Sequence, residues 1–162
     1  MLDKETESQL IFHDDLIDIG MTATDQEDAL AQLSQKFIQK GYVKTTYPEA
    51  LIKREKTFPT GLALNGIGIA IPHTDAEHVN SASLGIATLR KPVLFRAMDT
   101  GDLLEVHILF MLAITHPTAQ LKVLQKVVEL MRSEEALLSL KHSETKSDVK
   151  TIVKPFFGDL LA

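Results

Sequence analysis

The sequence predicts a layered α/β fold, in which helices flank a central mixed β-sheet. Apolar runs rich in β-branched residues occupy the middle of the chain, and helical patterns occupy both ends. The segment 103–114 is apolar almost throughout. Because such a continuous run is typical of a strand covered by helices on both faces, we expect the sheet to lie inside the molecule.

The composition of the 162-residue chain fits a single domain, 1–162, in which residues 1–8 form a frayed polar tail. The formal net charge of -5 argues against a nucleic-acid-binding protein, which would concentrate Lys and Arg on one face. The absence of cysteine excludes disulfides, thiolate metal sites and a cysteine nucleophile, and it fits a cytoplasmic location. No stretch approaches the roughly 20 apolar residues of a membrane span, so we expect no insertion into a membrane.

The N-terminal part begins with two short apolar segments. Residues 10–13 and 16–19 predict one or two strands near an edge of the sheet. A helix follows, which either Thr24 or Asp25 can cap and which Gly41 ends.

The next helix begins near Pro48 and runs to about Lys56. Residues 57–66 contain several turn formers and predict a loop. This loop leads into GIGIAIPH, residues 66–73, whose β-branched residues predict a strand that stops at Pro72.

Two further strands are expected at 82–89 and 103–114, and the chain is helical from Pro117 onward. Additional helices are expected to start at Ser133 and Ser147. The first of the C-terminal helices carries an apolar stripe, which predicts its buried face. The stripe is formed by Leu121, Leu124, Val128 and Met131.

The most informative residue is His73, which follows a buried strand and Pro72. We expect it at the carboxyl end of the sheet, where open α/β sheets place ligands. An imidazole with an unperturbed pKa of about 6.5 is largely neutral at pH 7, so it can accept a phosphoryl group without first losing a proton. A simple strand terminator followed by a polar turn would explain the same pattern.

A metal site is an alternative interpretation of this segment. His73, Asp75, Glu77 and His78 lie within six residues, and all four are possible zinc ligands. However, the two histidines are five residues apart, whereas helical zinc-binding pairs are four apart. A charged, solvated turn explains the cluster equally well.

Two other features lie near this histidine in the expected fold. Arg54 ends a helix just before the loop that leads to His73, where it would reach an anion carried by that histidine. Alternatively, it is an exposed arginine that pairs with Glu49 or Glu55. The helix start near Thr118 offers N–H groups to a phosphate, although simple capping explains this segment too.

Taken together, these segments resemble the enzyme IIA components of the sugar phosphotransferase system (PTS), in the fructose/mannitol class. GIGIAIPH is similar to the phosphorylation-site signature, in which the histidine after A-x-P is the phosphoacceptor. KREKTFPTG aligns Arg54 with the active-site arginine, and HPTAQLKVL is similar to the late strand–helix junction. The galactitol-type branch is the most similar, and Gln120 stands where the mannitol and fructose components have a second histidine.

The resemblance implies a phosphotransferase that needs neither cofactor nor metal. His73 would accept a phosphoryl group from the phosphocarrier protein HPr and pass it to a cysteine of a separate IIB component, for uptake of a sugar or polyol such as galactitol. Arg54 and the N–H groups near Thr118 would spread the transferring charge, and Gln120 would orient His73 or the phosphate. The other five histidines are interpreted as bystanders. The alternative is a regulatory IIA-like domain that acts through phosphorylation-dependent docking to a protein.

Overall fold

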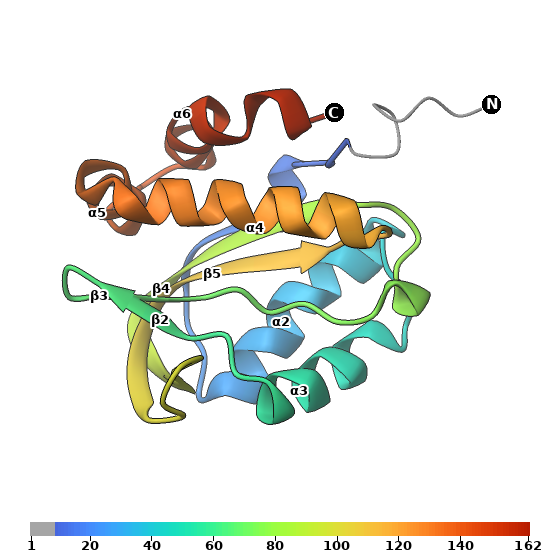
Figure 1. Cartoon of the computed structure of the whole chain (residues 1–162), viewed down its shortest axis with the longest axis horizontal. Helices are drawn as coiled ribbons and strands as arrows, with labels where there is room; N and C mark the ends of the chain where they lie inside the picture. The colour runs from blue at the N-terminus through green and yellow to red at the C-terminus, as the bar shows by residue number, and fades with distance from the viewer. Residues whose placement is uncertain (1–8) are drawn as a thin grey trace.

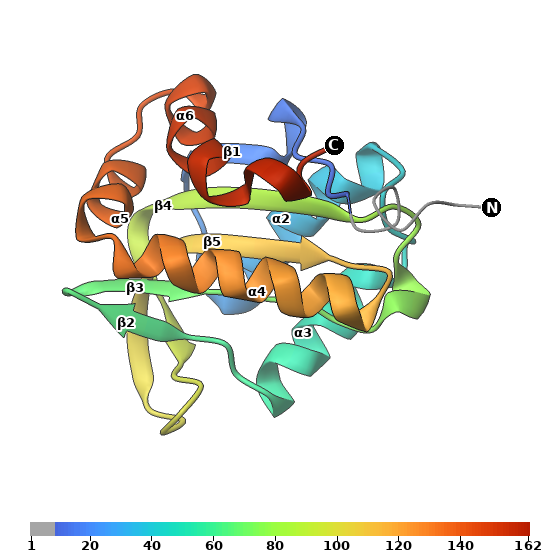
Figure 2. The ribbon, with the colours of Figure 1, turned by 45° about the horizontal axis from the view of Figure 1, so that its top comes forward.

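The computed structural model describes residues 9–162, which form a β-sheet between two layers of helices (Figure 1). The predicted tail 1–8 lies outside the described residues. Two helices cover one face of the sheet, α2 (Gln26–Gln39) and α3 (Tyr47–Thr57). The opposite face is covered by α4 (Pro117–Arg132), α5 (Glu134–Lys141) and α6 (Lys146–Phe157) (Figure 2). The predicted fold class is therefore confirmed.

The sheet has five strands in the order β1-β4-β5-β3-β2 and is mixed. β1 pairs with β4, and β3 with β5, in parallel, whereas the β4–β5 and β2–β3 pairs are antiparallel. The strands are β1 (Ile17–Met21), β2 (Leu62–Leu64), β3 (Ile67–Ala70), β4 (Ser83–Arg96) and β5 (Leu103–Ala113).

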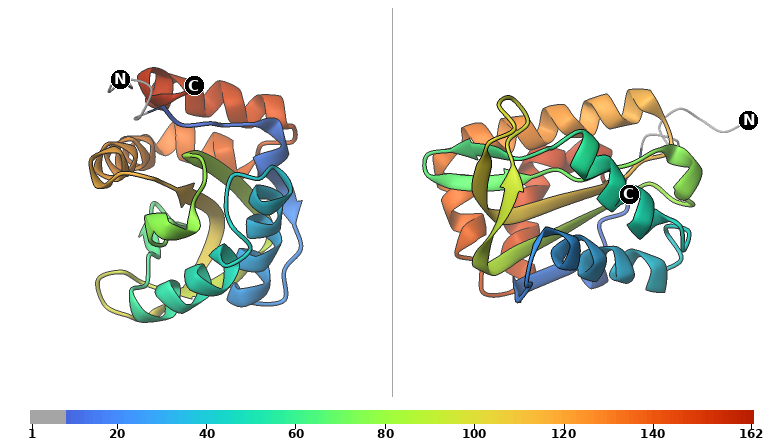
Figure 3. Two further views of the ribbon diagram at one scale, coloured as in Figure 1. Left: turned by 90° about the vertical axis from the view of Figure 1, so that its right-hand side faces the viewer. Right: turned by 90° about the horizontal axis from the view of Figure 1, so that it is seen from below.

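Strand β5 shows why the central run is continuously apolar. Its side chains alternate between the two faces of the sheet. Ile108, Phe110 and Leu112 belong to the core under α4, α5 and α6, whereas Leu109 and Met111 belong to the core over α2 and α3. The two helix layers on opposite sides of the sheet are visible in Figure 3. Helices thus cover both faces, as the sequence predicts.

Several predicted strand boundaries are wrong. Residues 10–13 contain only isolated bridges, and the first strand covers 17–21 instead of 16–19. The expected loop 57–66 includes the short strand β2, which forms a hairpin with β3. The strand predicted at 82–89 continues to Arg96 after an irregularity in its pairing with β5.

The predicted helix starts agree better with the structure than the predicted strand boundaries do. Asp25 caps α2 by accepting a hydrogen bond from the N–H of Asp28, at 2.8 Å, and Ser133 caps α5. The last helix is capped by Thr145, because Thr145 and Asp148 form a reciprocal capping box, and not at the predicted Ser147. Within residues 9–162, every helix is too short or too polar to cross a bilayer.

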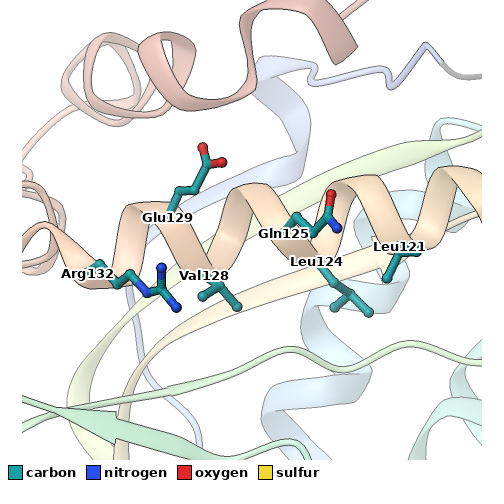
Figure 4. Close-up of a pocket in the computed structure, with 6 residues that line it drawn as sticks. All are labelled: Leu121, Leu124, Gln125, Val128, Glu129 and Arg132. Carbon is teal, nitrogen blue, oxygen red and sulfur yellow. The ribbon is translucent and has the colours of Figure 1, made fainter.

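The apolar stripe predicted on α4 is mostly wrong. Leu121 is 59% exposed and Val128 is 37% exposed, so only Met131 of the stripe is fully buried. The buried face is shifted around the helix, and it is formed by Ala119, Val123, Val127, Leu130 and Met131. Leu121, Leu124 and Val128 instead line an open groove of about 420 Å³ on the outside of α4 (Figure 4).

Candidate functional site

His73 lies just beyond the carboxyl end of β3, on a backbone that hydrogen bonds fix on both sides. The carbonyl of Pro72 accepts a hydrogen bond from the N–H of Leu112 on β5, at 3.0 Å. The N–H of Ile71 donates to the hydroxyl of Thr60, also at 3.0 Å. Because Ile71 and Pro72 are both buried, the polypeptide that carries His73 has little freedom to move.

The imidazole of His73 is held in one orientation by its own backbone. Its Nδ1 lies 2.8 Å from the carbonyl oxygen of Ile71. A carbonyl can only accept a hydrogen bond, so Nδ1 carries the proton in this arrangement. In the neutral ring, Nε2 is then the nitrogen with a free lone pair, and it is the nucleophilic atom of this side chain.

Arg54, near the end of α3, does not pair with either carboxylate that the sequence offered as an alternative partner. Its guanidinium lies 3.8 Å from a carboxylate oxygen of Asp75 and stacks over the ring of Phe58, at 4.6 Å from the centroid. Glu55 points away from solvent and bonds to Thr60 instead. The guanidinium is therefore directed toward the segment that follows His73.

Arg54 and His73 together line two adjoining cavities. The smaller has a volume of about 150 Å³, and the residues that line it include Gln120 as well as Arg54 and His73. The larger, of about 400 Å³, extends toward Phe58 and Met98. The structure thus brings together all three residues that the sequence singled out, from α3, from the end of β3 and from the first turn of α4.

The first turn of α4 closes one side of the smaller cavity. His116 and Pro117 line it, whereas Thr118, which the sequence suggested, is not among the lining residues. His116 occupies the N-cap position without a side-chain capping bond. The first N–H groups of a helix have no partner within the helix, so this end offers a partial positive charge to an anion.

Glu55 is a buried carboxyl group behind the site, only 3% exposed. Each of its two oxygens lies 2.7 Å from a donor of Thr60, one from the backbone N–H and one from the hydroxyl. Burial raises the pKa of Glu55 to about 7, although both hydrogen bonds from Thr60 act to lower it. The desolvation of this carboxylate therefore outweighs the hydrogen bonds that stabilise its charge.

Of the candidate metal ligands, only Glu77 and His78 are near each other in the structure, with Nε2 of His78 3.7 Å from a carboxylate oxygen of Glu77. Asp75 faces Arg54, and Nδ1 of His78 lies 2.8 Å from the hydroxyl of Thr46. In the part of the chain that the structure describes, no group of three or more His, Asp or Glu residues is arranged to hold a metal ion. The geometry of this segment is that of a turn, with the short 3₁₀ helix Ala76–His78.

The remaining histidines differ in their surroundings. Nδ1 of His107 accepts a hydrogen bond from the N–H of Gly68 at 3.1 Å, and partial burial lowers its pKa, as expected for a satisfied, half-buried histidine. His13 accepts the N–H of Asp15 at 3.0 Å. His116, interpreted from the sequence as a bystander, lines the same cavity as His73.

No sequence motif assigns Phe58, Thr60 or Asp75 to the cavities beside His73. Asp75 lies two residues after His73, and its proximity was the one available signal. Phe58 and Thr60 lie in a segment that sequence patterns identify only as a turn.

Comparisons with known proteins match most of the chain. The family described as "Phosphoenolpyruvate-dependent sugar phosphotransferase system, EIIA 2" matches residues 10–155. The galactitol-specific EIIA component of the PTS from Escherichia coli K12 is 31% identical over 130 residues, which cover 78% of this chain and 87% of that protein.

Two solved structures share the fold. One is the complex of enzyme IIAMTL and phosphorylated enzyme IIBMTL from Escherichia coli, with a TM-score of 0.75, 20% identity, and coverage of 90% of this chain and 99% of that one. The other is the nitrogen regulatory protein IIA-Ntr from Neisseria meningitidis, with a TM-score of 0.71, 23% identity, and coverage of 88% and 96%.

Proposed function

Since the chain belongs to the EIIA 2 family of the phosphoenolpyruvate-dependent sugar phosphotransferase system and is a phosphotransferase of that relay, we propose that His73 is its phosphoryl carrier. One observation carries this assignment. The Nδ1–H group of His73 donates to the carbonyl of Ile71, which leaves Nε2 as the unprotonated nitrogen. Nε2 is therefore ready to attack phosphorus without a separate general base.

The transfer step needs no net proton movement. Nε2 of His73 attacks the phosphorus of a phosphohistidine on the HPr phosphocarrier protein, so that a new N–P bond forms as the old one breaks. The lone pair of the broken bond returns to the donor histidine. The proton on Nδ1 of His73 stays where it is, and the positive charge that develops on the ring is stabilised by the carbonyl of Ile71.

The surroundings of His73 supply positive charge and hydrogen-bond donors for the transferring group. Arg54 lines both cavities beside His73, and its planar guanidinium suits the phosphoryl oxygens. The N-terminal end of α4 adds a partial positive charge at the smaller cavity. The Gln120 amide can donate a hydrogen bond to the phosphoryl group or to the ring but cannot titrate, so this mechanism uses a single carrier histidine.

The second transfer passes the phosphoryl group to a cysteine of a separate IIB component, where an S–P bond forms and the N–P bond to His73 breaks. The chain has no cysteine of its own. The relative from Escherichia coli K12 is the galactitol-specific EIIA component, and this supports galactitol or a similar polyol as the transported substrate.

Phosphorylation by phospho-HPr tests this proposal. The wild-type protein should acquire an acid-labile, base-stable phosphoryl group, which mass spectrometry of peptides should locate on His73. His73→Gln should lose it, whereas His142→Gln, which changes an exposed histidine beyond α5, should be labelled like the wild type. Full labelling of His73→Gln would overturn the assignment.

Onward transfer separates transport from regulation. Phosphorylated protein should lose its label to a galactitol-type IIB component faster than to a mannitol-type one. If no IIB component accepts the group although His73 is labelled, the chain instead acts as a regulatory domain that docks in a phosphorylation-dependent way.

A further inference from the structure

We propose that Glu55 and Thr60 are positioning residues for His73, and that they hold its imidazole in the nucleophilic tautomer through the backbone N–H and carbonyl of Ile71. The proposal rests on the proposed function, since it concerns the same carrier histidine. Glu55 and Thr60 are both buried, at 3% and 6% exposure, and Thr60 also lines the larger cavity beside His73. Both act on the ring indirectly, through backbone groups.

The connection consists of three consecutive hydrogen bonds. The Thr60 hydroxyl lies 2.7 Å from Oε1 of Glu55 and donates to that oxygen when the carboxylate is ionised. The same hydroxyl oxygen accepts the N–H of Ile71 at 3.0 Å. The carbonyl of Ile71 then accepts Nδ1–H of His73 at 2.8 Å. Glu55 is thus linked to the ring through one hydroxyl and one residue of the main chain.

The segment that carries Thr60 is itself fixed. The N–H of Thr60 donates to Oε2 of Glu55 at 2.7 Å. The next residue, Gly61, donates its N–H to the carbonyl of Arg96 at 3.1 Å and accepts the N–H of Met98 at 2.8 Å. A Cβ atom on Gly61 would lie 2.6 Å from the Arg96 oxygen, so the two backbones are in close contact. Thr60 therefore offers Ile71 a rigid acceptor.

Burial of a carboxyl group is unfavourable unless its oxygens are well bonded. Glu55 is almost completely buried and follows directly after Arg54 on α3. An apolar residue would fill this position without the desolvation that raises the pKa of Glu55 to about 7. Its hydrogen bonds to Thr60 instead fix the position of α3, which carries Arg54, relative to the backbone that carries His73. This geometry is what in-line transfer requires.

The tautomer of His73 distinguishes a positioning role of Glu55 and Thr60 from a purely structural one, which would leave the tautomer unchanged. In protein labelled with ¹⁵N-histidine at pH 8, long-range ¹H–¹⁵N correlation spectra should show the Nδ1–H form for the wild type. Thr60→Ser, which keeps the hydroxyl, should give the same form. Thr60→Val removes the hydroxyl at nearly constant volume, and we expect a mixture of the two tautomers.

The kinetics should follow the tautomer. Thr60→Val should lower kcat for phosphoryl acceptance by up to about 10²-fold, because a small misplacement of a reacting group has a cost of this size. KM for phospho-HPr should change little, because Thr60 and Glu55 are both buried and offer almost no surface to a docking protein. Thr60→Ser, which keeps the hydroxyl, should have the kcat of the wild type. An unchanged tautomer and an unchanged kcat in Thr60→Val would overturn the proposal.

Glu55→Gln provides a second variant in case Thr60→Val does not fold. The amide keeps one acceptor oxygen and loses the other. At pH 8, where the wild-type carboxyl group is mainly ionised, this variant should shift the tautomer and kcat in the same direction as Thr60→Val, by a smaller amount. A wild-type tautomer and kcat in folded Glu55→Gln would likewise overturn the proposal.

The spectra are recorded on unphosphorylated protein, so they test the positioning role separately from the proposed function. If the wild type accepted no phosphoryl group on His73, the proposed function would fail. The tautomers of the wild type, Thr60→Ser and Thr60→Val would still decide whether Glu55 and Thr60 orient the ring.

Discussion

At the scale of single residues, Arg54 has the environment of an anion-binding side chain that is held in place before the anion arrives. It stacks on Phe58, which is 59% exposed, and faces Asp75 across the smaller cavity. The pair with Asp75 is long and partly solvated, and such pairs contribute little to stability. A phosphoryl group on His73 would therefore displace Asp75 from the guanidinium at small cost.

Replacing Arg54 should slow transfer without unfolding the protein. We expect Arg54→Gln to lower the rate of phosphoryl acceptance by about 10²-fold to 10³-fold, the usual effect of removing one donor to a developing charge. Arg54→Lys should lie between this variant and the wild type, because lysine keeps the charge but loses the planar fork. Rapid-quench measurement of labelled protein gives these rates.

The neighbouring Lys53 provides the matched control, because it is exposed and carries the same charge. Lys53→Gln should accept the phosphoryl group at the wild-type rate. Equal rates for Arg54→Gln and Lys53→Gln would remove Arg54 from the site.

The sequence predicted the residues that carry motifs but not those that support them. His73, Arg54 and Gln120 come together in one cavity, as the motifs suggested. The support from Glu55 and Thr60 depends on which way a carboxylate points at the end of a helix and on how a turn folds back. No sequence pattern predicts the direction of the carboxylate or the path of the turn, because both depend on contacts with other segments.

At the scale of elements, β3 positions the site, and it does so by an unusually close approach to β5. A Cβ atom on Gly68 would lie 1.9 Å from the carbonyl oxygen of Glu105, so only glycine fits there. Gly66, in the same hairpin, has open space around its Cβ position but a φ of 77°. The two glycines are therefore required for different reasons.

Alanine substitution should separate these two reasons. Gly66→Ala should lower the free energy of unfolding by about 1–2 kcal/mol, the cost of a left-handed conformation for a residue with a Cβ atom. Gly68→Ala should be clearly more destabilising, since two backbones must move apart. Urea denaturation measures both, and equal losses would contradict the close approach of β3 to β5.

Elements were predictable where the spacing of the apolar residues and the capping residue indicated the same helix, and they were less predictable elsewhere. The α2 helix has both an N-cap and a consistent apolar face, and its predicted start was correct. The α4 helix has leucines on two faces, so the pattern alone selected the wrong one. Strand β4 continues beyond the exposed residues Arg90, Lys91 and Pro92, and two charged residues followed by a proline are typical of a strand end.

At the scale of the whole molecule, two apolar cores lie on the two faces of the sheet. Glu55 is an ionisable residue that is nevertheless buried. Its pKa is raised from 4.5 to about 7 by burial, so the folded state favours the protonated form. A raised carboxyl pKa stabilises the fold below the unfolded value, and this contribution is lost as the pH rises through the folded value. The fold should therefore lose stability between about pH 4.5 and pH 7 because of this one group.

Glu55→Gln isolates that loss, because glutamine resembles the protonated carboxyl group and does not titrate. Relative to this variant, the wild type should be most stable at pH 4 and below and should lose up to about 3 kcal/mol by pH 8, with the steepest change between about pH 4.5 and pH 7. Urea denaturation of both proteins at several pH values gives this difference, in which the other titrating groups cancel. Glu49→Gln, which changes an exposed carboxylate on the same helix, should show no such trend. A difference between wild type and Glu55→Gln that stayed constant or grew with pH would show that the hydrogen bonds from Thr60 outweigh the desolvation of Glu55.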